Sequence, residues 1–258
     1  MKLNTIDDFH LTDIDNEAHP SIFFKDENYD LFIIRIPKLT NNRVVPVSKA
    51  FIITDNSYFY YDRKNKNFID LKNIDGFYEF LNKDVDSIMR MVNAYINEIE
   101  DIEDSFYENK IDKNFNKKWF SYKNDFIKMN RVLFKCVEVI AVLINDYKKD
   151  DDYLKSNFED MQEHLNRAHR NSGMLLEKLD ALHNSYIVEN NEQMNRTVYI
   201  LTLLSVVFLP LNLIVGFFGM NTTSLPFTQG IGGTQLVINI LFFSAIMSIL
   251  LVFFIKKR

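Results

Sequence analysis

Residues 197 to 255 contain no Asp, Glu, Lys, Arg or His, and this uncharged stretch constrains the fold more than any other feature of the chain. It holds two long apolar runs, Val198 to Phe218 and Leu236 to Ile255, with a polar segment between them. Each run has the length of about 20 residues that a helix needs to cross a hydrocarbon core of roughly 30 Å. The sequence therefore predicts two C-terminal transmembrane helices joined by a short loop.

The charged residues that flank this stretch predict its orientation. The N-terminal part is rich in charged residues and opens without the apolar core of a secretory signal peptide, so we expect it in the cytoplasm. The chain ends in three basic residues, Lys256, Lys257 and Arg258, and the positive-inside rule places this end in the cytoplasm too. We therefore expect an integral protein of a bacterial inner membrane, with both termini cytoplasmic and the short loop outside.

The composition argues against several other classes of protein. The single Cys136 cannot form an internal disulfide, which suits a reducing compartment. A formal net charge of −5 argues against nucleic acid as a partner. Residues 1–196 show no nucleophile–base pair, phosphate loop or metal-ligand motif, so we expect neither an enzyme nor a resident cofactor.

The part before the membrane predicts an α+β fold. From Ser21 to Leu71, β-branched and aromatic runs alternate with polar turn clusters, which indicates strands in a small α/β or α+β domain. From Gly76 onward the apolar spacing is helical, which indicates a helical layer.

One long helix is expected to join this helical layer to the membrane. Apolar or small residues recur at alternating spacings of four and three, and no proline interrupts the chain between Pro46 and Pro210. Such a pattern is typical of a stalk, which would run from about Asp150 to Phe218 without a break, the alternative being separate helices that break at Gly173. The series consists of Leu154, Phe158, Met161, Leu165, Ala168, Ser172, Leu175, Leu179, Leu182 and Tyr186.

These patterns divide the chain into six segments. The expected order is a cytoplasmic α/β domain at 1–75, a cytoplasmic helical bundle and stalk at 76–195, a first transmembrane helix at 196–219, an extracytoplasmic loop at 220–234, a second transmembrane helix at 235–255 and a basic cytoplasmic tail at 256–258.

The first membrane run carries a stripe of mostly small and polar residues. Positions at alternating spacings of three and four share one helix face. An amide such as that of Asn212 is costly in lipid unless it is hydrogen-bonded, so the stripe should face protein or water. It could form a seam between helices or the wall of a pore, and a pore would need several copies of the chain. Its residues are Asn195, Val198, Thr202, Ser205, Leu209, Asn212 and Gly216.

The chemistry of the stripe favours a hydrated hard cation. It has no carboxylate, thiolate or imidazole, whereas zinc prefers Cys and His ligands. Magnesium sheds its water reluctantly, and amide and carbonyl oxygens can accept hydrogen bonds from that water. Zinc can also pass in hydrated form, so the stripe does not exclude it.

At this point the residues resemble a known family. The run from Gln193 to Asn221 is similar to the first membrane helix of the CorA family of divalent metal ion transporters. The features that carry the resemblance are Gly219-Met220-Asn221 (the GMN motif) at the outer end, Pro210, Gly216, Asn195, and two C-terminal spans followed by a basic tail.

The resemblance implies a homopentamer in the lipid bilayer whose central pore is lined by the first membrane helix. It implies that Gly219, Met220 and Asn221 form the outer mouth, with Asn221 as the selectivity residue for hydrated Mg²⁺. By position, Leu209 would narrow the pore, with Asn212 and Gly216 above it. Asn195 and Val198 would lie toward the cytoplasmic entrance, near a ring of Lys256, Lys257 and Arg258.

Some residues depart from the family pattern and leave the substrate open. The loop contains no acidic residue, and Gly232-Gly233 follows the motif at a distance. A zinc or other transition-metal transporter of the same family, with or without coupling to protons, is therefore one alternative. A non-conducting oligomeric scaffold or sensor is the other.

The family also implies that Mg²⁺ or Zn²⁺ can bind between cytoplasmic domains as a regulator. Asp150, Asp151 and Asp152, at the foot of the expected stalk, are candidates for such a site. The alternative is a solvated helix start, where acidic residues suit the positive end of the helix dipole.

Overall fold

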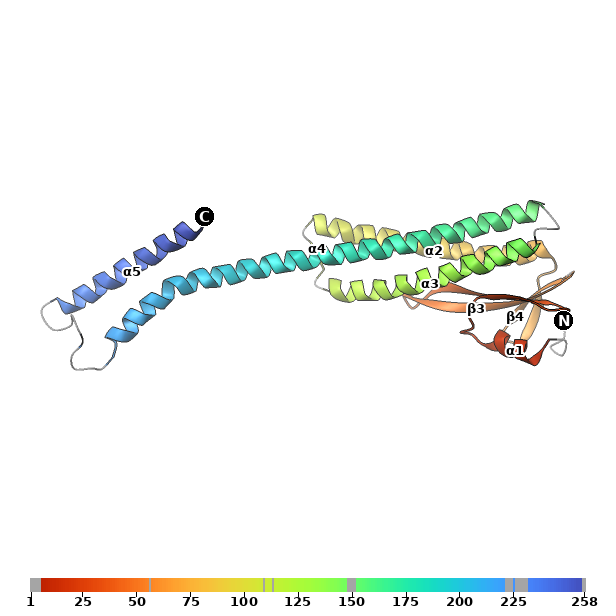
Figure 1. The fold of residues 1–258 in the computed structure, drawn as a ribbon, viewed down its shortest axis with the longest axis horizontal. Coiled ribbons are helices and arrows are strands. Elements are labelled where there is room, and N and C mark those ends of the chain that lie inside the picture. The colour runs from red at the N-terminus through yellow and green to blue at the C-terminus, as the bar shows by residue number, and fades with distance from the viewer. Residues whose placement is uncertain are drawn as a thin grey trace. The chain divides into compact units, whose positions relative to one another are not determined.

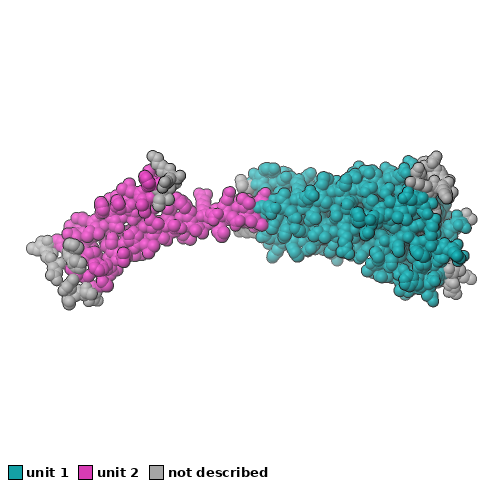
Figure 2. All heavy atoms as spheres, viewed as in Figure 1, with its two compact units in different colours: residues 1–184 teal, residues 185–258 magenta. Residues whose placement is uncertain are grey.

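The structure is a computed structural model that describes residues 6–55, 57–108, 110–112, 114–147, 152–220, 225 and 232–256. A short helix, five strands and four longer helices follow one another along this part of the chain (Figure 1). The chain separates into two compact units, unit 1 at residues 1–184 and unit 2 at residues 185–258 (Figure 2).

Unit 1 contains a single antiparallel sheet. Strands β1 to β5 lie in chain order, each paired with the next. The turn between β2 and β3 has Asn41 and Asn42 at φ 51° and 56°, the left-handed conformation that a two-residue hairpin requires. The α+β class is confirmed. The strands are β1 (Ile22–Lys25), β2 (Asp30–Thr40), β3 (Arg43–Thr54), β4 (Ser57–Asp62) and β5 (Asn67–Asp70).

The sheet is covered on both faces. Helix α1 (Asp8–Asp15) covers one face, where Ile14 packs in a cluster with Leu31, Ile33 and Ile52. Helix α1 was not expected from the sequence, because it is a single short helix whose apolar pattern is weak. On the opposite face, Phe32 and Phe51 pack edge-on against Phe77 of α2 (Ile74–Tyr107), with ring centroids 5.8 and 5.2 Å apart.

Three long helices lie side by side over that second face of the sheet (Figure 1). They are α2, α3 (Phe115–Tyr147) and the first part of α4 (Asp152–Phe218). The repeating residues of α4 from Phe158 to Leu182 are all buried here, as their heptad spacing predicts. Burial of this stripe supplies the hydrophobic free energy that holds α4 against α2 and α3.

Helix α4 is a single element, which confirms the expectation of one helix that runs unbroken into the first apolar run. Gly173 lies within it and causes no break. Pro210 also lies within it, and because proline has no N–H, the carbonyl of Val206 lacks its usual helical donor.

Unit 2 consists of the C-terminal part of α4 and of α5 (Gly233–Lys256). Both helices are long and apolar enough to cross a membrane, as the sequence predicts. They cover each other along complementary faces. On α4 the half-buried positions are Leu203, Val206, Val207, Pro210, Leu211, Ile214 and Phe218, and on α5 the covered positions are Gly233, Val237, Leu241, Ser244, Ala245, Ser248 and Val252.

Candidate functional site

The end of α4 is shaped by a glycine that cannot be replaced without strain. The N–H of Gly219 donates to the carbonyl of Val215 at 2.8 Å, and the N–H of Met220 donates to the carbonyl of Phe217 at 3.4 Å. A Cβ atom on Gly219 would lie 2.8 Å from the oxygen of Val215, closer than side-chain carbons pack. The motif's first glycine therefore lets the backbone close tightly over the last turn of the helix, and Met220 is left half-exposed beyond it.

Several of the expected site residues lie outside the described residues. These are Asn221 in the loop, Lys257 and Arg258 in the tail, and Asp150 and Asp151 before α4. Two others are placed by their backbone alone, since Asp152 begins α4 and Lys256 ends α5.

All seven residues of the polar stripe lie on α4 and all are exposed. Leu209, for example, is 67% exposed and Val198 is 55% exposed. The stripe lies on the side of α4 roughly opposite the face that α5 covers, because its positions differ from the covered ones by about half a helical turn. Within unit 2, therefore, the seam with α5 is a different face, and the stripe is left for another molecule or for water.

Two hydroxyl groups of the stripe can accept hydrogen bonds from solvent or a ligand but do not donate them, because their protons are used within the helix. The Oγ1 of Thr202 donates to the carbonyl of Val198 at 2.9 Å, and the Oγ of Ser205 donates to the carbonyl of Leu201 at 2.9 Å. Each hydroxyl proton is thereby committed to the helix backbone, while the oxygen can still accept. The amide of Asn212 adds a further acceptor on the same line. A surface of this kind suits a species that donates hydrogen bonds, such as the water shell of a cation.

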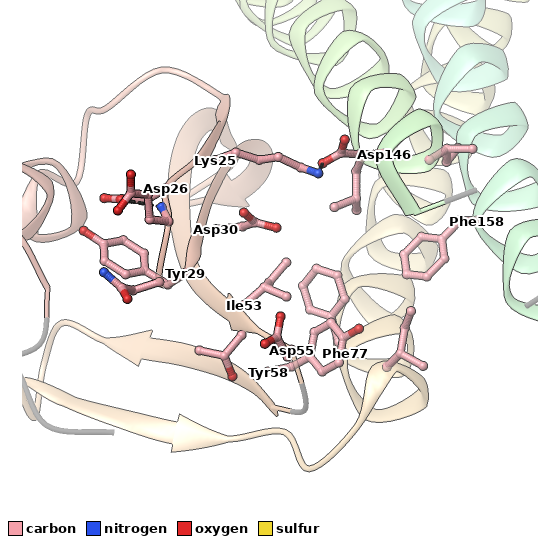
Figure 3. Close-up of a pocket in the computed structure, with 16 residues that line it drawn as sticks. Lys25, Asp26, Tyr29, Asp30, Ile53, Asp55, Tyr58, Phe77, Asp146 and Phe158 are labelled. Carbon is pink, nitrogen blue, oxygen red and sulfur yellow. Dashed lines mark hydrogen bonds and ion pairs between the residues drawn. The ribbon is translucent and has the colours of Figure 1, made fainter. Parts of the chain in front are cut away.

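A second candidate site is an acidic cavity of about 690 Å³ in unit 1 (Figure 3). It lies where the β1–β2 and β3–β4 turns approach the end of α3 and the start of α4. Asp30 and Asp55 lie on its sheet side and Asp146 on α3, while Phe77 and Phe158 form an apolar wall (Figure 3). These carboxylates could not be grouped from the sequence, because they come from a strand, a turn and a helix that lie far apart in the chain.

One ion pair partly neutralises this acidic cavity. The Nζ of Lys25 lies 2.6 Å from a carboxylate oxygen of Asp146 and links β1 to α3. Over the described residues, no group of three or more His, Cys, Asp and Glu side chains converges as metal ligands would. The cavity therefore has the charge to attract a cation but not, within this part of the chain, a preformed coordination shell.

The buried groups of the helical layer have shifted pKa values that reflect structure. Burial raises the pKa of the Cys136 thiol, whose Sγ donates to the carbonyl of Arg35 at 2.9 Å. Burial likewise raises the pKa values of Tyr95 and Tyr122, with the nearby carboxylates of Asp125 and Glu98 adding to the effect. The two tyrosines join α2 to α3 and Cys136 joins α3 to β2, so we assign these protonated groups a structural role.

The sequence matches a known protein family. A family model described as CorA-like Mg2+ transporter protein matches residues 4–257. The protein named "Putative metal ion transporter YfjQ" from Bacillus subtilis (strain 168) is 27% identical over 108 residues, which are 42% of this chain. The matched segment spans only 34% of that relative.

Solved structures share the fold. The complete CorA magnesium transporter from Methanocaldococcus jannaschii has a TM-score of 0.80 at 19% identity, over 96% of this chain and 83% of that one. The full-length CmaX protein has a TM-score of 0.73 at 14% identity, over 97% of this chain and 82% of that one. The cytoplasmic domain of ZntB from Vibrio parahaemolyticus has a TM-score of 0.56 at 12% identity, over 73% of this chain and 81% of that one.

Proposed function

Because the chain belongs to the family of CorA-like Mg2+ transporter proteins, we propose that it is a divalent metal ion channel that conducts hydrated Mg²⁺ down its electrochemical gradient. The observation that carries this proposal is the exposed stripe on α4, which points away from α5 and presents oxygen acceptors. A hydrated cation offers water protons in all directions, and oxygen acceptors satisfy them without removing the water.

The pore would be built from several copies of the chain. One α4 and one α5 cannot enclose a channel, and the described residues of unit 2 do not cover the stripe. A homopentamer with α4 innermost places the seven stripe residues around a common axis in the bilayer and leaves α5 on the outside. The exposed Leu209 would then form an apolar narrowing, with Asn212 and Gly216 on its outer side.

The mouth of the pore would be formed by Gly219, Met220 and Asn221. The tight end of α4 at Gly219 fixes where the chain leaves the helix, and this supports a role for Asn221 as the selectivity residue. At the opposite end, Asn195 and Val198 would lie near the cytoplasmic entrance with Lys256, Lys257 and Arg258. This orientation puts both termini in the cytoplasm of a bacterial cell, with the protein in the inner membrane.

Mg²⁺ is proposed over Zn²⁺ because the stripe contains no Cys, His, Asp or Glu. Bare zinc prefers thiolate and imidazole ligands, so a zinc pathway would have to pass the ion with its water. A regulatory role for Mg²⁺ at Asp150, Asp151 and Asp152 belongs to the same proposal. Neutralising these three charges should make ion flux insensitive to internal Mg²⁺. If internal Mg²⁺ still inhibits flux to the same extent, the three aspartates do not form a regulatory site.

The decisive experiment is divalent cation flux into proteoliposomes under an imposed membrane potential. Wild-type protein should conduct Mg²⁺, and Asn221→Ala should reduce its selectivity or its flux by at least about tenfold, a loss of about 1.4 kcal/mol of stabilisation. Asn239→Ala, which removes an exposed amide from α5, is the matched control. Flux of Zn²⁺ alone would reassign the substrate, and no flux of either ion would favour a non-conducting scaffold or sensor.

A further inference from the structure

A second cavity in unit 1, of about 540 Å³, has the opposite charge to the acidic one. It opens between β2, α3 and α4, and the side chains that matter come from all three elements. Arg35 lies on β2, Arg131 and Lys135 lie one turn apart on α3, and His169 faces them from α4. Its volume is in the range of small-molecule sites.

Two cations of this cavity lack the ion pairs that some other cations of unit 1 form with described residues. Lys49 pairs with Asp84 and Arg170 pairs with Glu163. By contrast, neither Arg35 nor Arg131 has an ion pair with any residue that the structure describes, and no carboxylate is among the described residues that line the cavity. Lys135 does pair with Glu138, at 2.6 Å, on the solvent side. The cavity therefore holds two guanidinium groups without counter-charges.

The backbone N–H and carbonyl of Arg35 are hydrogen-bonded, whereas the Nε of its side chain has no hydrogen-bond acceptor among the described residues. Its N–H donates to the Oγ of Ser21 at 2.9 Å, and its carbonyl accepts from the Sγ of Cys136 at 2.9 Å. Its Nε is inaccessible to solvent and has no hydrogen-bond partner among the described residues. A buried donor without an acceptor is costly and rare in folded proteins. Because this Nε is closed off from solvent, an anion in the cavity would bind the guanidinium through its two terminal nitrogens, and its negative charge would stabilise the partly buried cation.

The opposite walls of the cavity are tied together, so its shape is held. The amide nitrogen of Asn130 on α3 donates to the carbonyl of His169 at 3.3 Å and to the Oγ of Ser172 at 3.1 Å, both on α4. At the rim, the rings of Phe134 and His169 lie 5.8 Å apart. The cavity is thus lined by the half-buried Arg35, the exposed Arg131 and Lys135, and an aromatic ring, and hydrogen bonds that do not use the guanidinium groups join its walls.

We propose that this cavity binds a small soluble anion that carries a phosphate or diphosphate group. The planar fork of a guanidinium matches phosphate oxygens with two parallel hydrogen bonds, and two unpaired arginines suit a diphosphate better than a single carboxylate. The Oγ of Ser21, which accepts from Arg35, keeps its own proton to donate. The half-exposed ring of Phe134 gives a flat apolar surface on which the nucleobase of a nucleoside diphosphate could stack.

The test is calorimetric titration of the detergent-solubilised full chain with pyrophosphate, ADP and, as an uncharged comparison, adenosine. We expect pyrophosphate and ADP to bind, adenosine not to bind, and the affinity to fall as salt rises. Tighter binding of ADP than of pyrophosphate would assign Phe134 to the base. Absence of binding by both anions at millimolar concentration would overturn the proposal.

Matched variants locate the binding. Arg131→Gln should weaken binding of pyrophosphate at least tenfold, and Arg35→Lys should weaken it while keeping the charge, because lysine lacks the planar fork. Lys128→Gln removes the same charge from an exposed position three residues earlier on α3 and should leave affinity within twofold. If Lys128→Gln and Arg131→Gln weaken binding equally, the anion is attracted by the general charge of α3 and the cavity is not the site. Unchanged melting temperatures establish that each variant is folded.

Discussion

The N–H of Gly219 and the carbonyl of Val215 form the last 2.8 Å hydrogen bond of α4, and the oxygen of Val215 also occupies the space that a Cβ atom on Gly219 would need. Three residues earlier, a Cβ atom on Gly216 would meet nothing within 4 Å. The two glycines therefore serve different purposes. Gly219 is required by the fold of a single chain, whereas the described residues of that chain impose no such requirement at Gly216.

This difference predicts opposite results for two alanine variants. Gly219→Ala should strain the end of α4, lower the melting temperature of the detergent-solubilised protein and reduce ion flux, with a cost of about 1–3 kcal/mol. Gly216→Ala should leave the stability of the individual chain unchanged or raise it by up to about 1 kcal/mol, because alanine is the better helix former, and yet alter conductance, because the added methyl would narrow the pore. Equal loss of stability in both variants would show that Gly216 also packs within its own chain.

The acceptor role of the stripe is tested by a matched pair of threonines. Thr202 and Thr197 both donate to the carbonyl four residues earlier, at 2.9 and 3.0 Å, and both are exposed, but only Thr202 lies on the stripe. Thr202→Val keeps the shape and removes the acceptor, so Mg²⁺ flux should fall severalfold. Thr197→Val should leave flux unchanged. The same loss in both variants would mean that the hydroxyls act through helix geometry rather than through the pore.

The buried stripe of α4 predicts where unit 1 gains stability. Leu179 is fully buried between the helices, and Leu179→Ala should cost about 2–5 kcal/mol and lower the melting temperature of the protein. Met174 on the same helix is 59% exposed, and Met174→Ala should have little effect on melting. A small effect at Leu179 would show that α4 is held by contacts outside its own chain.

The buried thiol of Cys136 predicts a specific pH dependence of stability. Burial raises the pKa of this thiol, so the folded state retains a proton that the unfolded state loses above a pKa of about 8.5. The stabilisation is complete below that pH and is lost as pH rises above it, by up to about 1.4 kcal/mol per pH unit. Melting temperatures between pH 7.5 and 9.5 should therefore fall more steeply for wild type than for Cys136→Ala. Parallel slopes would contradict burial of the thiol.

Much of the helical architecture was predictable from the sequence. The stripe from Phe158 to Leu182 is buried as its four–three spacing predicts, because a long amphipathic helix must bury one continuous face. Helix α1 was not predictable in the same way. Its eight residues carry too little periodicity, and Ile14 is buried only because the sheet lies beneath it.

Of the candidate sites, the polar stripe could be recognised in the sequence, whereas the acidic and basic cavities could not. The polar stripe was visible in the sequence, but its exposure could not be decided there, because it depends on which face of α4 packs on α5. A usable signal existed in the small residues Ser244, Ala245 and Ser248, whose spacing marks the covered face of α5. The acidic cavity and the basic cavity of unit 1 had no such signal. Lys25 and Asp146, or Arg35 and Arg131, become neighbours only through the tertiary fold.

Pro210 gives α4 one mechanically soft point. Elsewhere the helix resists bending because backbone hydrogen bonds join each turn to the next. Pro210 has no N–H, so one of these hydrogen bonds is missing. Thermal bending of the helix should therefore concentrate at this position. The last two turns or so of α4, which lie beyond Pro210, then move together as one rigid segment that ends at Gly219 and Met220. A small change of angle at the proline would displace that end sideways while the turns on either side stay rigid.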